Sequence, residues 1–174
     1  VERGGDVEET TFTIEANEYA FEILSAGLYS DRIGAIIREL AANASDAHVD
    51  AGTTHIPYLI HCPNYLEPYF KIRDFGTGLD PKQVKSLYSR YFASTKSNSN
   101  DFVGCMGLGS KSPFAYGDSF SVISYYNGQK YIFNSYKNER NCPAISLLGQ
   151  EDTTEPNGLE VSFPVKSSDF SEFA

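Results

Sequence analysis

The sequence predicts an α+β fold, a two-layer α/β sandwich with helices on one face of a mixed, mostly antiparallel sheet. Three observations favour this class. Apolar residues recur at helical spacing in 33–51 and 79–92, short aromatic and β-branched runs have the pattern of strands, and an Asn-Gly dipeptide joins two of those runs. Because most strands follow the helices along the chain, we expect one sheet with its helices on one side.

The bulk composition indicates one globular domain. The chain has 174 residues, of which 41% are hydrophobic and 21% are charged. We expect a flexible N-terminus over 1–10 and a single domain over 11–174. The chain begins with valine and not with methionine, so we expect it to be a fragment of a longer protein.

Charge and cysteine content argue against several kinds of site. The formal net charge is -9 and the basic residues form no cluster, so we expect no nucleic-acid surface on this domain. Cys62, Cys105 and Cys142 lie far apart and form no CxxC pair, which favours neither a disulfide framework nor a zinc site. A reducing cytoplasm fits this pattern, and no apolar run approaches the roughly 20 residues of a membrane-spanning helix.

Alternation and helical spacing predict six elements in the first half of the chain. They are a strand at 11–15, helices at 16–28 and 33–51, strands within 55–61 and at 69–73, and a helix at 79–92. Ser30 or Asp31 is expected to cap the long helix, and Gly52 to end it. Pro81 fits the first turn of the last helix.

A polar stretch and a glycine-rich stretch separate these elements from the later strands. Residues 93–102 (ASTKSNSNDF) predict a mobile loop, which leads into the glycine-rich segment 104–117. The segment 119–136 (SFSVISYYNGQKYIFNSY) predicts a hairpin that turns at its Asn-Gly dipeptide. AISLL at 144–148 and GLEVSFPV at 158–165 are the last predicted strands.

A row of polar residues follows the long helix. Glu39, Asn43 and Asp46 occur at steps of four and three residues, beside an apolar stripe that should face the core. At such a border a carboxylate can act as a general base, and an asparagine oxygen can bind Mg²⁺. A solvated polar face explains this helix equally well when it is considered alone.

A DxGxG motif follows the strand at 69–73. Asp74 could accept a hydrogen bond from an exocyclic amine such as that of adenine, while Gly76 and Gly78 let a flat ligand approach the backbone. A simple hairpin turn is the alternative interpretation.

The segment GCMGLGSKS contains a third motif. Gly104, Gly107 and Gly109 leave backbone N–H groups free to bind phosphate oxygens, and Lys111 could add a cation. The spacing is not that of a P-loop, and no βαβ unit begins here as a dinucleotide fingerprint requires.

In this order, the three motifs resemble the N, G1 and G2 boxes of the GHKL ATPases, a superfamily that includes DNA gyrase B, the large heat-shock chaperone, MutL and the histidine kinases. The resemblance covers roughly residues 31–117. It implies a sandwich of the GHKL type in which ATP lies between helices and sheet, under a lid at about 93–110. It also implies Mg²⁺-dependent hydrolysis of ATP and formation of a homodimer when ATP binds.

The resemblance implies a role for individual residues. Glu39 would be the catalytic base that activates water, and Asn43 would bind Mg²⁺. Asp74 would accept the hydrogen bond of the adenine amino group, and residues 93–97 (ASTKS) are similar to the start of the MutL lid. The residues expected to surround ATP are Asn43, Asp46, Asp74, Gly76, Gly78, Leu79, Ser94, Thr95, Lys96, Gly104, Met106, Gly107, Leu108, Gly109, Ser110 and Lys111.

One position departs from the superfamily pattern. Leu159 follows Gly158 where the relatives have a threonine, so the water-assisted adenine contact of that hydroxyl would be missing.

Two segments are also similar to a narrower family. Residues 24–48 and 107–128 resemble the N-terminal domain of the rIIA-type proteins of large tailed phages. This resemblance implies a bacteriophage protein that acts in the cytoplasm of the infected bacterial cell and is membrane-associated as a full-length chain.

Two other functions remain open alternatives. The domain could sense ATP and hardly hydrolyse it, because the relatives receive a cation for the γ-phosphate from a following domain. A histidine-kinase-type phosphotransferase shares the fold. It is disfavoured because its phosphoacceptor helix hairpin would have to precede the first predicted strand. Only some ten residues of this sequence lie ahead of that strand.

Overall fold

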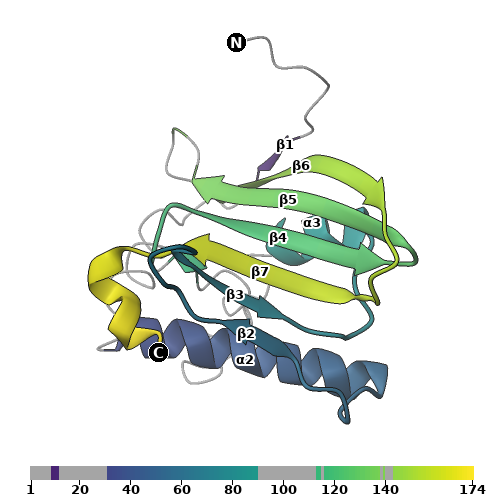
Figure 1. Cartoon of the computed structure of the whole chain (residues 1–174). Helices are drawn as coiled ribbons and strands as arrows, with labels where there is room; N and C mark the ends of the chain where they lie inside the picture. The colour runs from purple at the N-terminus through teal and green to yellow at the C-terminus, as the bar shows by residue number, and fades with distance from the viewer. Residues whose placement is uncertain (1–8, 12–30, 90–112, 115, 138, 140–142) are drawn as a thin grey trace, which may run out of the picture.

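Within the part of the chain that the structure describes, seven strands form one sheet. The computed structural model describes residues 9–11, 31–89, 113–114, 116–137, 139 and 143–174. The strands are β1 (Glu9–Thr11), β2 (Leu59–His61), β3 (Tyr69–Arg73), β4 (Ser119–Tyr126), β5 (Gln129–Lys137), β6 (Pro143–Asp152) and β7 (Gly158–Pro164). They lie in the order β1-β6-β5-β4-β7-β3-β2, and every neighbouring pair is antiparallel (Figure 1).

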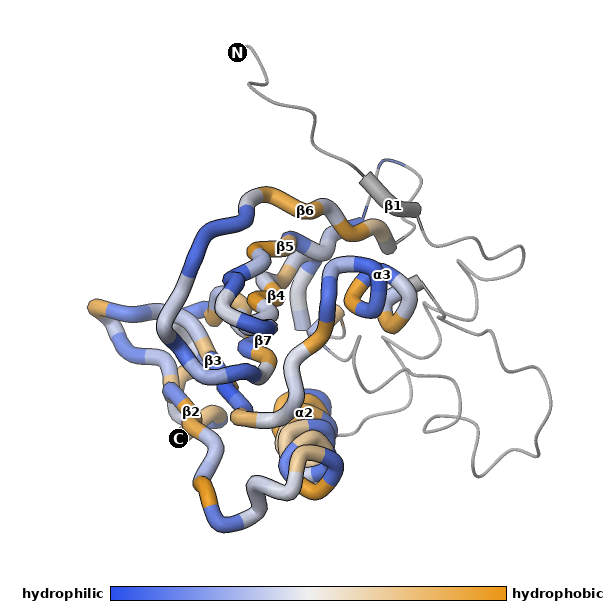
Figure 2. Tube along the Cα trace, turned by 90° about the vertical axis from the view of Figure 1, so that its right-hand side faces the viewer, coloured by the Kyte–Doolittle hydropathy of each residue, from blue (hydrophilic) through white to orange (hydrophobic). Residues whose placement is uncertain are grey.

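Two helices form the second layer, α2 (Arg32–Ala51) and α3 (Pro81–Ser89). Figure 2 shows both on the same side of strands β3, β4 and β7. Helix α2 packs against β3, and α3 packs against β6 and β1. The predicted α+β class, with helices on one face of a sheet, is therefore confirmed, whereas the predicted mixed sheet is antiparallel in all of its described strand pairs.

Helix α2 begins and ends where its sequence signals predict. The side chain of Asp31 accepts a hydrogen bond from the backbone N–H of Gly34 at 2.9 Å, which makes Asp31 the N-cap. Gly52 ends the helix in the left-handed conformation, with φ 68°, which glycine adopts without steric cost. Ile33, Leu40 and Ala44 are buried, so the apolar stripe faces the sheet.

The hairpin of β4 and β5 turns at the predicted dipeptide. Asn127 and Gly128 have φ angles of 50° and 79°, as a two-residue turn with positive φ at both positions requires. Further along β5, the pairing with β6 shifts, because Ile132 lies opposite Gly149 and Phe133 lies opposite Leu147. The residue left between them, Leu148, is exposed, as expected for a β-bulge.

The core lies between the sheet and the two helices. Alternate residues of β3, β4 and β7 point toward it, since side chains in a strand alternate between the two faces. After the short helix η2 (Ser167–Glu172), the ring of Phe173 packs 5.4 Å from that of Phe70 and 5.8 Å from that of Phe163. The C-terminal segment therefore belongs to the same core.

Some element boundaries differ from the prediction. β1 begins at Glu9, two residues before the predicted strand, and the rest of that strand and the helix at 16–28 lie outside the described residues. Only Leu59–His61 of the predicted 55–61 segment forms a strand, because Pro57 has no N–H to donate to a neighbouring strand. No helix in the described ranges is long and apolar enough to cross a membrane.

Candidate functional site

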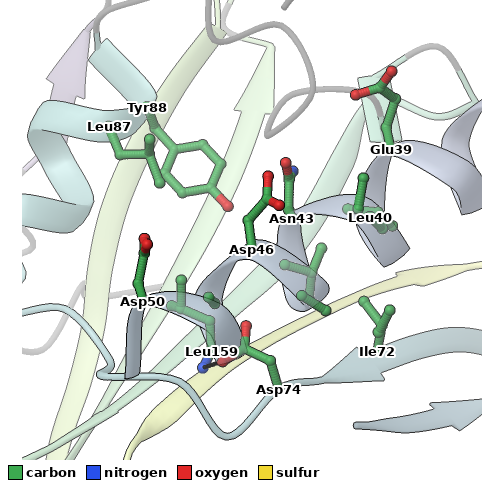
Figure 3. A pocket seen from close by; sticks show the side chains of 14 residues that line it. Glu39, Leu40, Asn43, Asp46, Asp50, Ile72, Asp74, Leu87, Tyr88 and Leu159 are labelled. Carbon is green, nitrogen blue, oxygen red and sulfur yellow. Dashed lines mark hydrogen bonds between the residues drawn. The ribbon is translucent and has the colours of Figure 1, made fainter. Parts of the chain in front are cut away.

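A cavity of about 510 Å³ opens between α2, α3 and the strands β3 and β7 (Figure 3). Four predicted site residues line it, of which three lie on α2 and one at the end of β3. The lining residues are Glu39, Leu40, Ala42, Asn43, Ala44, Asp46, Ala47, Asp50, Ile72, Asp74, Leu87, Tyr88, Leu159 and Val161. The cavity thus joins the polar row of the long helix to the DxGxG motif.

The polar residues of α2 are spread along the cavity. Glu39, Asn43 and Asp46 lie on the same side of the helix because steps of four and three residues return to one face. Figure 3 shows Glu39 at one end of the cavity and Asp74 near the other. Ala47 contacts the turn after Asp74, and it follows Glu39 by eight residues, or about 12 Å along a helix axis. Glu39 and Asp74 therefore lie toward opposite ends of the cavity.

Asp74 is the buried carboxylate of the site. Its Oδ1 accepts two backbone hydrogen bonds, from Gly76 at 2.9 Å and from Leu159 at 3.1 Å. Within the described ranges no donor is placed on Oδ2, which leaves one oxygen for a ligand. Burial raises the pKa of Asp74, although the two N–H donors and the neighbouring Arg73 act in the opposite direction.

Arg73 and Gly158 hold the backbone around Asp74. The buried guanidinium of Arg73 donates to the carbonyl of Asp74 and lies 4.1 Å and 4.5 Å from the ring centroids of Tyr125 and Phe75. Gly158 has φ 149°, and a Cβ there would lie 2.0 Å from the Asp74 carbonyl oxygen. Only glycine lets β7 approach the end of β3 this closely.

The other walls of the cavity are apolar. Leu40 and Ala44 of α2, Ile72 of β3, and Leu159 and Val161 at β7 present aliphatic surface. Such a wall suits a flat, weakly polar ring system, since binding would remove apolar area from water.

Helix α3 closes one side of the cavity with Leu87 and Tyr88. The Tyr88 ring is 2% exposed, and burial raises the pKa of its hydroxyl. This hydroxyl therefore stays protonated and can donate a hydrogen bond.

The remaining predicted residues fall into two groups. Gly76, Gly78 and Leu79 follow Asp74 but do not line the cavity. A Cβ on Gly78 would lie 2.2 Å from the carbonyl oxygen of Tyr125, so sheet packing accounts for this glycine, while its contact with a ligand stays a prediction. The second group lies outside the described residues and comprises Ser94, Thr95, Lys96, Gly104, Met106, Gly107, Leu108, Gly109, Ser110 and Lys111.

The described lining of the cavity is acidic. It contains the carboxylates of Glu39, Asp46, Asp50 and Asp74, and none of the described lining residues is Lys, Arg or His. A polyphosphate therefore needs a counter-charge from a metal ion or from another part of the chain.

One curated protein similar to this chain is the DNA mismatch repair protein MutL of Leuconostoc citreum. The two sequences are 29% identical over 86 residues, which make up 49% of this chain and 12% of MutL. The chain thus spans only a small part of that relative. No family model matches the chain. The distant similarity to MutL agrees with the GHKL resemblance of the motifs.

Several residues of the site were not predicted. Asp50 follows Asp46 by four residues, so helix periodicity could have placed it on the same face of α2. Tyr88 follows the buried Val84 by four residues. This spacing indicated that Tyr88 faces the core, but it did not indicate that Tyr88 borders a cavity. The parts played by Arg73 and Leu159 depend on contacts between β3 and β7, which are distant in the sequence.

Proposed function

We propose that this domain binds ATP together with Mg²⁺ and hydrolyses it slowly, as a GHKL-type ATPase. The observation that carries the proposal is the meeting of two separate motifs around one cavity, the row of α2 and the buried Asp74. A solvated helix face and an ordinary hairpin turn would not need to share a pocket. The distant similarity to MutL supports the same assignment.

Adenine would bind at the Asp74 end. Oδ2 of Asp74, to which no described residue donates, is an acceptor at a largely buried position, and an exocyclic amine is a matching donor. The aliphatic side chains of Ile72, Leu159 and Val161 would contact the faces and edges of the ring. Leu159 lacks the hydroxyl that GHKL relatives have here, so in this chain the base would be recognised mainly through Asp74.

The phosphates would extend along α2 toward Glu39. Asn43 and the neighbouring Asp46 supply oxygen atoms of the type that Mg²⁺ prefers, and the bound ion would offset the negative charge of phosphates and cavity. Glu39 would accept a proton from the water that attacks the γ-phosphorus as the bond to the leaving ADP breaks. The segments at 93–110 and Lys111 would close over the phosphates as a lid.

The wider role proposed for the full-length protein follows from the two resemblances. ATP binding would order the lid and promote a homodimer, and hydrolysis would reverse both. The similarity to rIIA-type proteins suggests a phage protein in the cytoplasm of the infected bacterial cell, with membrane association supplied by the whole chain.

A second candidate function is ATP sensing with negligible turnover. The acidic lining favours it, because none of the described lining residues can supply a cation to the γ-phosphate. The domain would then bind ATP tightly enough to change its partners while the bound nucleotide persists.

Calorimetric titration with Mg-ATP, a non-hydrolysable analogue and Mg-GTP tests the proposal, followed by sizing of each complex. We expect both adenine nucleotides to bind at least about tenfold more tightly than GTP and the analogue to shift the protein toward a dimer. Equal affinity for ATP and GTP would contradict the adenine assignment, and no binding of either would contradict the function. Phosphate release from the full-length protein separates hydrolysis from sensing.

A further inference from the structure

We infer that His48 is a positioning residue that aims the free carboxylate oxygen of Asp74 into the cavity. This inference rests on the proposed function, because it assigns the group that orients the adenine-recognising side chain. His48 lies in the last turns of α2, is not among the residues that line the cavity, and touches the turn that follows Asp74.

Both ring nitrogens of His48 are engaged. The backbone N–H of Phe75 donates to Nε2 at 2.7 Å, and Nδ1 lies 3.1 Å from the carbonyl oxygen of Thr53. A backbone N–H can only donate and a carbonyl can only accept, so the proton must be on Nδ1. The ring is 3% exposed, which leaves water little access to replace either partner.

Thr53 holds the other backbone polar group of the same residue, Phe75. Its hydroxyl donates to the carbonyl oxygen of Phe75 at 3.0 Å. Phe75 is thus held at its N–H by His48 and at its carbonyl by Thr53. These bonds join the C-terminal end of α2 to the turn of the DxGxG motif.

This attachment bears directly on Asp74 because Phe75 separates it from Gly76. The N–H of Gly76 donates to Oδ1 of Asp74, so the orientation of the carboxylate depends on the path of the turn. A Cβ on Gly76 would lie 2.8 Å from that of Ala47, which shows how closely the turn approaches α2. Loss of the His48 bond would leave the Phe75 N–H unpaired and free the turn to shift.

Two substitutions separate this role from simple packing. His48→Gln can place an amide oxygen near the position of Nε2, whereas the shorter amide of His48→Asn reaches only the position of Nδ1. We expect the Kd for Mg-ADP to change by less than about threefold in His48→Gln and to rise at least about tenfold in His48→Asn. We also expect His48→Asn to lose most of the preference for ADP over GDP.

Controls use residues of the same type elsewhere. His61→Asn changes a half-buried histidine on β2 whose Nε2 contacts Glu67, and it should leave ADP affinity unchanged. If the His48 variants fail to fold, Thr53→Val and Thr53→Ser provide the same contrast, since only serine keeps the hydroxyl that binds Phe75. Valine should weaken ADP binding and serine should preserve it.

The outcomes separate this inference from the proposed function. If the wild-type protein binds neither ATP nor ADP, the proposed function fails, while amide exchange at Phe75 still tests whether His48 holds the turn. Faster exchange in His48→Asn than in His48→Gln supports the attachment. Wild-type binding of ADP together with equal affinities in the Gln and Asn variants would overturn the positioning role and leave the proposed function intact.

Discussion

The backbone N–H of Leu159 donates a hydrogen bond to Oδ1 of Asp74 over 3.1 Å, although the two residues lie 85 positions apart. The bond uses the backbone of Leu159, so it does not depend on which side chain stands at this position. No described residue donates to Oδ2 of Asp74, which is therefore the oxygen that we assign to a ligand.

Asp74→Asn should separate binding from stability. The asparagine oxygen can keep the bonds from Gly76 and Leu159, but the amide then turns two donors toward the donor of adenine. We expect ADP affinity to fall about 10–100-fold. The melting temperature at neutral pH should not fall, because the amide avoids burying a charge. A lower melting temperature with unchanged affinity would contradict the role given to Asp74.

Binding of adenine nucleotides should depend on pH through Asp74. Because Oδ1 already accepts two N–H groups, a proton would bind to Oδ2 and convert the free acceptor into a donor. Burial raises the pKa of Asp74 above its usual 3.8, so affinity should be complete above the raised pKa and fall as the pH decreases through it.

The comparison of wild type with Asp74→Asn, titrated with ADP between about pH 4 and 8, isolates this effect from the titration of the phosphates. The free energy of unfolding should depend on pH in the opposite direction to the affinity for ADP. Since the folded-state pKa is the higher one, Asp74 favours the folded state most below the unfolded pKa, and this contribution is lost as the pH rises through the folded pKa. An identical pH profile in both proteins would contradict the prediction.

Glu39→Gln should abolish turnover and preserve binding. The amide has nearly the shape of the carboxylate but cannot accept a proton from water, and a general base contributes about 10²–10⁴-fold to a rate. We expect the rate of phosphate release from the full-length protein to decrease by about 10²–10⁴-fold, while the Kd for Mg-ATP changes less than about threefold. Glu155→Gln, on the exposed loop before β7, is the control. Retained turnover would remove Glu39 from the role of base.

Removal of divalent metal should weaken ATP binding strongly. Without a bound cation, the phosphates would lie beside Glu39 and Asp46 in a cavity that also contains the carboxylates of Asp50 and Asp74. We therefore expect the Kd for ATP to rise at least about tenfold in EDTA. In EDTA, Asp50→Asn should lower the Kd for ATP about threefold relative to wild type, because it removes one negative charge from the cavity. Asp152→Asn, at an exposed position outside the cavity lining, should leave this Kd unchanged. An affinity for ATP that does not depend on the metal would contradict the placement of the phosphates beside Glu39 and Asp46.

Gly158→Ala should destabilise the protein through the backbone at Asp74. The added Cβ would lie 2.0 Å from the Asp74 carbonyl oxygen and 2.1 Å from Nη1 of Arg73, at a φ that disfavours alanine. We expect a loss of about 2–4 kcal/mol in the free energy of unfolding, measured by chemical denaturation. Gly117→Ala should change it by less than about 0.5 kcal/mol, because nothing lies within 4 Å of its Cβ position.

Local signals predicted the elements that build the site. Asp31 and Gly52 mark the ends of α2, and the Asn127-Gly128 turn sets the register of β4 against β5. These features depend on a few neighbouring residues, so the sequence was sufficient to locate them. The spacing of Glu39 and Asn43 likewise placed them on one helix face.

Contacts between distant segments decided the rest. Packing of α2, β3 and β7 buries Asp74 and brings the N–H of Leu159 to one of its oxygens. The same packing brings His48 to the amide of Phe75. Hydrogen-bond partners of this kind leave no periodicity in the sequence, because each pair meets only when the sheet has formed. The amino-acid sequence by itself thus determined which side chains are available, and the tertiary structure decided which carboxylate is buried and which of its oxygens the backbone holds.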